Sequence, residues 1–96
     1  MLLVAIMTVP RAQLDAFRAY EHAAAKIMAR HRGAIERALV LDEGGETLRE
    51  LHIVRFPTDD DFTRYRADTE LRALANVRAS CMLSTEILPA CDGPTY

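Results

Sequence analysis

His52 and Glu50, separated by a single position, form the pair in the sequence best suited to acid–base chemistry. Within a strand both side chains would point to the same face, because alternate residues of a strand do so. An imidazole beside a carboxylate in a covered pocket could act as a general base, and burial would shift the pKa values of both groups. The alternative is a hydrogen-bonded structural pair at a subunit interface, and the sequence leaves both interpretations open.

Three further charged residues could hold a ligand. Glu21 falls within the apolar stripe of a predicted helix, where an unpaired carboxylate would be costly, so we expect it to have a partner. Arg55 and Arg78 are the candidate partners, in an ion pair that either faces a ligand or is purely structural. Arg78 could bind a ligand carboxylate through two of its nitrogens, or it could close the pocket by pairing with Glu21 or Glu70.

Two tyrosines bring hydroxyl groups to otherwise apolar helix faces. Each could orient a ligand carbonyl, although a tyrosine more commonly packs its ring in the core and leaves its hydroxyl at the edge. The candidate site residues are therefore His52 and Glu50 for catalysis and, for ligand binding, Tyr20, Glu21, Arg55, Tyr65 and Arg78.

Motifs for metals, phosphates and serine nucleophiles are absent. The histidines His22, His31 and His52 show no H-x-H or H-x-x-x-H spacing, so no metal site is expected, and we expect His22 and His31 to be solvated helix residues. No glycine-rich phosphate loop follows a strand, and there is no G-x-S-x-G sequence. We expect no cofactor.

Cysteine usage and charge indicate the environment of the chain. Cys81 and Cys91 do not form a C-x-x-C motif, which favours two reduced thiols in a cytoplasmic protein. The apolar segment 1–9 lacks the basic leading region and cleavage site of a signal peptide and is too short to span a bilayer. The formal net charge is −2 and no basic run exists, so we expect neither a nucleic acid nor a membrane as partner.

The elements that must position these residues are indicated by hydrophobic periodicity. Residues 2–9 are almost all apolar, as in a central strand covered on both faces. Pro10 suits the first position of a helix that continues to about Arg32, where Gly33 would end it as a left-handed cap. Strands are expected at 34–41 and 47–56, joined by a glycine-containing turn at 42–46.

A second helical region follows the third strand. Thr58 is a plausible N-cap, and Asp68-Thr69 indicates a break and a second cap before a helix over residues 70–81. A last strand is expected at 83–88, ended by Pro89. Residues 1–89 then make one domain, and residues 90–96 make a C-terminal tail.

The predicted order of strand, helix, strand, strand, helix, strand is the ferredoxin-like βαββαβ pattern of the α+β class. Right-handed crossovers place both helices on one face of a four-stranded antiparallel sheet, with the first and third strands in the centre. The other face is apolar too. Each Å² of apolar surface that stays in water loses about 25 cal/mol of the stabilisation that burial would give. We therefore predict a homodimer packed sheet to sheet. The alternative is that the C-terminal tail folds back over this face, but its seven residues are too few to cover it well.

Several short motifs occur in a recognisable order along the chain. They are Tyr20, His31-Arg32-Gly33, Arg55-Phe56-Pro57-Thr58, Tyr65, Asp68-Thr69-Glu70-Leu71 and Leu74 to Arg78. On these residues the chain resembles the dimeric α+β barrel superfamily over residues 2–88, and within it most resembles a family of small bacterial proteins known as a domain of unknown function. The family often has a Gly-Gly pair after its histidine, where this chain has Arg32-Gly33.

This resemblance implies a homodimer with a pocket in each subunit between sheet and helices. Related branches of the superfamily include cofactor-free monooxygenases, lactone isomerases and proteins of stress response or antibiotic biosynthesis. The expected function is therefore the binding of a small organic molecule. Whether the protein is a cofactor-independent enzyme, with His52 as the base, or a non-catalytic structural or interaction dimer is left open by the sequence.

Overall fold

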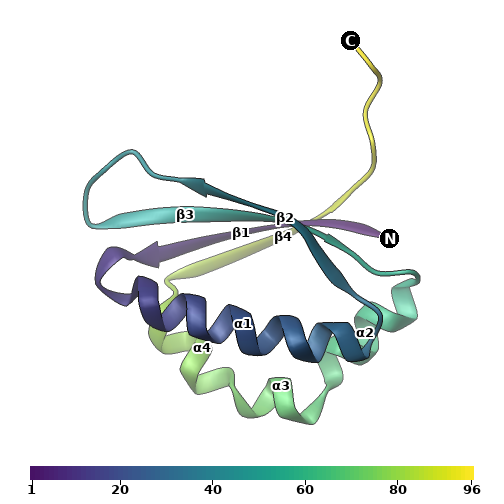
Figure 1. Ribbon diagram of the computed structural model, residues 1–96, viewed down its shortest axis with the longest axis horizontal. Helices are drawn as coiled ribbons and strands as arrows, with labels where there is room; N and C mark the ends of the chain where they lie inside the picture. Colours follow the sequence, from purple (N-terminus) through teal and green to yellow (C-terminus); the bar gives the residue numbers. More distant parts are fainter.

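The computed structural model describes all 96 residues and has the ferredoxin-like βαββαβ fold. Figure 1 shows one sheet with all the helices on the same side of it. The elements are β1 (Leu2–Pro10), a 3₁₀ turn η1 (Arg11–Gln13), α1 (Leu14–Arg30), β2 (Ala34–Leu41), β3 (Thr47–Arg55), α2 (Asp59–Ala67), α3 (Thr69–Ala73), α4 (Ala75–Cys81) and β4 (Ser84–Ala90).

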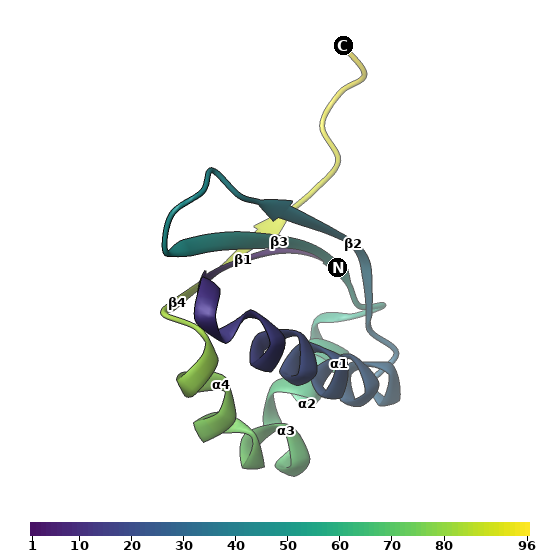
Figure 2. The ribbon, with the colours of Figure 1, turned by 60° about the vertical axis from the view of Figure 1, so that its left-hand side comes forward.

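The four strands lie in the order β2-β3-β1-β4, and all three neighbouring pairs are antiparallel. The first and third strands are thus the central pair, as the sequence predicts. Figure 2, a view from another side, shows all four helices beneath the sheet, with α1 beside the other three. No helix lies on the opposite face of the sheet. The predicted fold class is confirmed.

The register of the central strands decides which side chains meet the helices. Leu3 lies opposite Val54, and Met7 lies opposite Glu50. These residues and His52 are all buried, because they occupy the face that the helices cover. The candidate pair of β3 therefore points toward the helices and away from the open side of the sheet.

The core between sheet and helices consists of two clusters of buried side chains. The larger, which we call the α1–α4 cluster, contains Phe17 and Val9, both fully buried. The smaller, which we call the Phe56 cluster, joins Phe56 to Leu3 and Met28, among others. Phe62 and Tyr65 of α2 pack against this smaller cluster and cover one end of the sheet.

The start of α1 differs from the sequence expectation. Pro10 is the last residue of β1, with φ −61° and ψ 132°, and its extended ψ excludes it from the helix. The pairing of β1 with β3 continues one step beyond it, since the backbone N–H of Arg11 donates to the carbonyl of Glu46 at 2.8 Å. The prediction that Pro10 opens the helix is therefore wrong, and α1 begins only after η1.

The end of α1 also differs. The residue with left-handed backbone is Arg32, at φ 64°, and not Gly33. The N–H groups of Arg32 and Gly33 donate to the carbonyls of Ala29 and Met28, which is the Schellman pattern of a helix end. Gly33 is needed for a different reason, because a Cβ atom there would lie 2.4 Å from Cε1 of Phe56. The predicted role of Gly33 as the left-handed cap is wrong.

The second helical region contains three short helices. Thr58 caps α2 by accepting the N–H of Asp61 at 3.1 Å, and Asp68 caps α3 by accepting the N–H groups of Glu70 and Leu71, so both predicted caps are confirmed. The single helix expected over 70–81 is interrupted between α3 and α4.

The interruption lies at Leu74. Its N–H donates to the carbonyl of Leu71 at 3.0 Å, three residues back, which tightens the backbone into a 3₁₀ turn. Because side chains three residues apart eclipse in such a turn, Leu71 and Leu74 both pack against the α1–α4 cluster.

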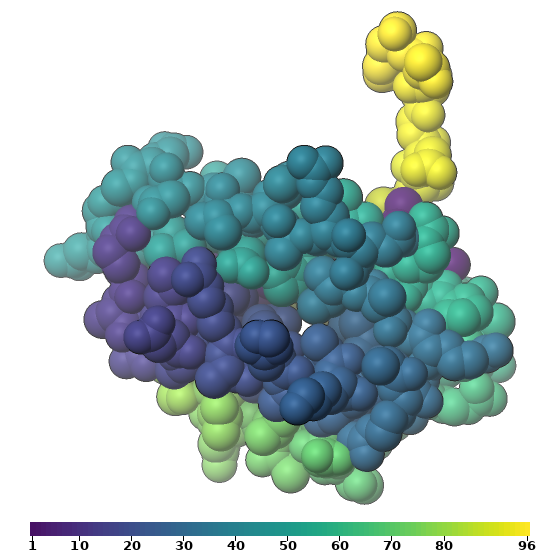
Figure 3. Space-filling model, in the orientation of Figure 1, coloured from purple at the N-terminus to yellow at the C-terminus, as the bar shows by residue number.

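The last strand runs past its predicted end. β4 includes Pro89, which lies opposite Leu3 of β1. Proline is tolerated there because β4 is an edge strand and needs ladder hydrogen bonds on one side only. Residues 91–96 have no regular structure and stand away from the body of the molecule (Figure 3). They do not fold back over the sheet.

The side of the sheet opposite the helices carries many apolar side chains, and we call it the open face. By the strand register, the larger apolar residues of the open face are Leu2, Val4, Ile6, Leu39, Leu41, Leu51, Ile53 and Leu88.

The helices of the structure lack the combination of length and hydropathy that a membrane-spanning helix requires.

Candidate functional site

A cavity of about 310 Å³ lies between the sheet and the helices. Its walls come from both core clusters, and 15 of its 20 lining residues are hydrophobic. Five of the seven predicted site residues line it, namely Tyr20, Glu21, His52, Tyr65 and Arg78. An apolar chamber with a few polar side chains that converge on it is the usual form of a small-molecule site.

His52 is held between two carboxylates at the sheet side of the cavity. Its Nε2 lies 2.8 Å from Oε1 of Glu50, and its Nδ1 lies 3.7 Å from Oε2 of Glu21. An ionised Glu50 can only accept, so a neutral His52 donates from Nε2 and turns the lone pair of Nδ1 toward Glu21. The two ring nitrogens thus have different roles, and Nδ1 is the one beside a group that also lines the cavity.

Glu50 is more deeply placed than Glu21. It is buried next to His52, it does not line the cavity, and its second oxygen, Oε2, has no hydrogen-bond partner. Burying a carboxylate with one unpartnered oxygen costs folding free energy. Glu50 therefore depends on its one hydrogen bond, to His52.

Glu21 is the half-buried carboxyl group of the cavity. Burial raises its pKa above the ordinary value of 4.5. The positive charge that His52 carries when its ring is protonated opposes this rise, Glu50 reinforces it, and Arg78 opposes it more weakly. A carboxyl group with a raised pKa beside an imidazole can gain or lose a proton nearer to neutral pH.

Arg78 reaches the cavity from α4 at the side of β4. Its Nη2 donates to Oγ1 of Thr85 at 2.7 Å, and that hydroxyl in turn donates to Sδ of Met82 at 3.3 Å. Tyr20, from α1, is buried nearby. Burial raises the pKa of Tyr20, and the positive charge of Arg78 opposes the rise. A hydroxyl and a guanidinium therefore share this end of the cavity.

Tyr65 closes the cavity from α2. Its ring lies 5.5 Å from that of Phe56, and a tilted aromatic pair of this kind fixes the ring plane. Burial raises the pKa of Tyr65 well above its ordinary range, so the phenol stays neutral. As a neutral hydroxyl it can donate or accept a hydrogen bond.

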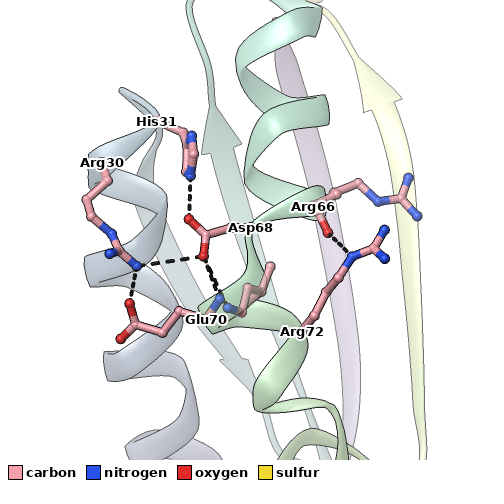
Figure 4. A network of polar contacts seen from close by, with 7 residues as sticks. Arg30, His31, Arg66, Asp68, Glu70 and Arg72 are labelled. Carbon is pink, nitrogen blue, oxygen red and sulfur yellow. Dashed lines mark hydrogen bonds and ion pairs between the residues drawn. The ribbon is translucent and has the colours of Figure 1, made fainter.

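A polar network fastens α1 to the junction of α2 and α3, beside this wall (Figure 4). Nε2 of His31 lies 2.7 Å from Oδ2 of Asp68, and Arg30 forms ion pairs with Asp68 and Glu70. The hydrogen bond from His31 holds the pKa of Asp68 below its ordinary value. His31 is therefore a partly buried bridging residue, and the expectation that it is merely solvated is wrong.

Arg55 is not part of this assembly. It is exposed, it belongs by register to the open face of β3, and its guanidinium pairs with Glu36 of β2. Alternation along the strand puts its side chain on the opposite side from His52. The expectation that Arg55 binds the ligand or partners Glu21 is not met.

Sequence reasoning missed two polar residues of the cavity. Thr85 holds Arg78 in place, and its only sequence signal is its position on the predicted last strand. Arg66 lines the cavity from α2, with its guanidinium carbon 5.5 Å from the centre of the Phe62 ring. Among the charged residues of α2 nothing in the sequence distinguishes Arg66.

The geometry also bears on metal binding. No group of three or more histidine, cysteine, aspartate or glutamate side chains is placed to hold a metal ion. Glu21 and Glu50 face different nitrogens of the His52 ring, so the three side chains do not converge on one point.

No protein-family model and no curated protein matches the sequence. Solved structures do match the fold. The cofactor-independent oxygenase SnoaB from Streptomyces nogalater is similar with a TM-score of 0.66 and 14% identity, covering 96% of this chain and 94% of that one. An antibiotic biosynthesis monooxygenase matches with a TM-score of 0.71 and 9% identity, over 98% of this chain and 100% of that one.

A protein of unknown function from Nitrosomonas europaea also matches, with a TM-score of 0.57 and 17% identity, over 99% of this chain and 94% of that one. At such identities the likeness establishes the fold and no more. The chain therefore has the same four-stranded, ferredoxin-like fold as these solved structures.

Proposed function

We propose that the chain binds a small, mostly apolar organic molecule in the cavity and transfers a proton to or from it, using its own side chains as acid and base. One observation carries the proposal. The His52 ring lines an apolar cavity of about 310 Å³ and has a carboxylate at each ring nitrogen. That volume lies at the lower end of the range of about 300–1,000 Å³ for ligand sites.

The proposed chemistry is removal of a proton from a carbon next to a carbonyl group. Nδ1 of His52 accepts the proton, with Glu21 beside it, and the electron pair of the broken C–H bond moves to the carbonyl oxygen as an enolate until a proton returns to the carbon. Glu50 stabilises the positive charge that then develops on the imidazole, because it already accepts from Nε2. The apolar walls keep water from competing for the same hydrogen bonds.

The structural matches are compatible with this reaction class. SnoaB is described as a cofactor-independent oxygenase, so one protein of this fold carries out its reaction without a bound cofactor. The protein from Nitrosomonas europaea, of unknown function, shares the fold as well. The proposal therefore rests on the cavity and its residues, and the comparison supports only its plausibility in this fold.

The second candidate is a dimer whose cavity binds a ligand without turning it over. The small size of the cavity favours it, as does the ordinary structural role of a buried His–Glu pair. The two candidates agree on binding and differ on proton transfer, so one experiment can separate them.

We expect the protein to accelerate exchange of the carbon-bound protons next to the carbonyl of 2-tetralone in D₂O, followed by proton NMR. In the His52→Gln variant the amide can still donate to Glu50 but cannot carry a proton, so exchange should fall to the buffer rate while binding shifts of 2-tetralone persist. His22→Ala, which removes an exposed histidine of α1, is the matched control and should exchange like the parent protein.

Binding without accelerated exchange would instead support the non-catalytic candidate. Exchange that survives in His52→Gln would remove His52 from the mechanism. Absence of any binding shift, in a protein shown to be folded by its dispersed NMR spectrum, would contradict both candidates.

We also propose that the working form is a homodimer joined through the open face. Helices cover only one side of the sheet, and residues 91–96 leave the other side uncovered. Leu51 and Ile53 of β3 lie beside Ile6 and Val4 of β1 there, so the centre of the open face is apolar. Burying such a surface against a second copy is the simplest way to remove it from water.

A further inference from the structure

From the Arg78 corner of the cavity we infer that the ligand is an organic anion, with a carboxylate held by Arg78 and Tyr20 and an apolar body that reaches toward His52. This inference rests on the proposed ligand-binding function and adds the chemical class of the ligand.

Arg78 is half-buried, and none of the ion pairs in the structure involves it. Its charge acts on the pKa of Glu21, but the two side chains do not form an ion pair. The guanidinium of Arg78, which carries five N–H groups, donates one of them to Thr85 and lies beside the hydroxyl of Tyr20. Several strong donors therefore remain available at a mostly apolar cavity.

The guanidinium is also held in a fixed orientation. Thr85 accepts from Nη2 on the side of β4, and Tyr20 approaches from α1. A guanidinium fixed in this way matches a carboxylate, because its N–H groups present a planar fork to the two oxygens. The Tyr20 hydroxyl can add a third donor.

A second unpaired guanidinium lies along the same cavity. Arg66 lines it from α2, is exposed, and forms no ion pair with any carboxylate. Ile87 of β4 lines the cavity and is 48% exposed, so the cavity reaches solvent on this side. An anion that enters past Ile87 meets Arg66 at the surface and Arg78 farther in.

The two carboxyl groups next to His52 explain why the ligand carries its negative charge at one end only. Glu21 lines the cavity beside one nitrogen of the His52 ring and Glu50 is buried at the other, so a second anionic group near His52 would be repelled. The apolar body of the ligand, with its exchangeable proton, therefore lies toward His52, and the carboxylate lies toward Arg78.

The test compares two probes of the same size and shape by isothermal titration calorimetry, the anionic 2-naphthoate and the neutral 2-naphthamide. Because hydrogen bonds between a guanidinium and a carboxylate are about twice as strong as neutral ones, we expect the acid to bind at least about tenfold more tightly than the amide. In Arg78→Gln this preference should vanish while the affinity for the amide stays the same. Arg18→Gln, which removes an exposed arginine of α1, is the matched control and should keep the preference.

Arg78→Lys provides a second variant that keeps the charge, and it should retain part of the preference because a lysine cannot form the planar fork. Equal affinity of the parent protein for both probes would overturn the inference and leave the proposed function intact. A preference for the acid that persists in Arg78→Gln would also overturn it. If neither probe binds, the proposed ligand site fails and the inference fails with it.

Discussion

At the scale of single residues, the cavity brings together side chains that are distant in the sequence. Residue type and local alternation were enough to select His52 and Glu50 and to predict that they share a face. The sequence did not determine which of two arginines lies near Glu21, because that depends on the face of β3 that meets the helices. The register of β3 places Arg55 on the open face, whereas Arg78 of α4 lines the cavity.

Glu21 gives a prediction about stability. Its pKa is raised in the folded chain, so folding favours its protonated form, and this favourable contribution is present at low pH and is lost as the pH rises through the raised pKa. Glu21→Gln, which cannot ionise, should therefore have a higher Tm than the parent protein at pH 8, and the difference should shrink toward pH 4. His52 lies next to Glu21, and charge interactions link the pKa of Glu21 with those of Glu50, Arg78, Cys81, Tyr65 and Tyr20.

Thermal melts followed by circular dichroism across this pH range would check the prediction. Glu43→Gln is the control, because it removes an exposed carboxylate from the turn between β2 and β3. A parent protein that is more stable than Glu21→Gln at pH 8 would show that the ionised carboxylate contributes more through His52 than its burial costs.

At the scale of elements, sequence patterns located every strand and the N-caps of α2 and α3 but misplaced the boundaries that depend on packing. The end of α1 shows why. Helix-capping preferences assign glycine to the left-handed position, yet here Arg32 takes that backbone conformation. The glycine is required one residue later, where the Phe56 ring leaves no room for a side chain. A contact with a residue of another element cannot be read from local sequence.

Gly33→Ala should therefore destabilise the protein although alanine is the better helix former. Its Cβ would meet Phe56 at 2.4 Å and Met28 at 2.6 Å, both in the buried Phe56 cluster. Overpacking of this kind typically costs about 1–3 kcal/mol. Urea unfolding should show a lower midpoint with an unchanged slope.

Gly93→Ala is the matched substitution, because nothing lies near the position where its Cβ would stand. It should change the free energy of unfolding by less than about 0.5 kcal/mol. If the two variants unfold at the same denaturant concentration, the close approach of Gly33 to Phe56 is not a constraint in solution.

At the scale of the whole molecule, the main feature is the sheet with one covered and one open side. Two-sided apolar character in the first strand predicted this arrangement, because helices in this topology can cover only one side. The position of residues 91–96 could not be predicted in the same way, since a short tail without an apolar pattern has no preferred docking site. The structure leaves the tail extended and the open face uncovered (Figures 1 and 3).

The homodimer proposal predicts that Leu51→Glu yields a folded monomer. Leu51 lies at the centre of the open face, opposite Ile6. A carboxylate at this position stays hydrated in the monomer, but in the dimer it would be buried without a partner, which is costly. Light scattering after size-exclusion chromatography should give the mass of two chains for the parent protein and of one chain for the variant.

Leu83→Glu, which changes a leucine that is 65% exposed just before β4, should leave the mass of two chains unchanged. A parent protein that elutes with the mass of one chain at micromolar concentration would contradict the dimer.

The division of the core into two clusters has a consequence for an occupant of the space between them. The cavity is lined by side chains from both clusters, so a ligand bound in it makes dispersion contacts with both at once. Such a ligand connects α1 and the central strands to α2 and α4. Occupancy and folding are then linked by mass action, and the resistance of the chain to unfolding rises with the concentration of the ligand.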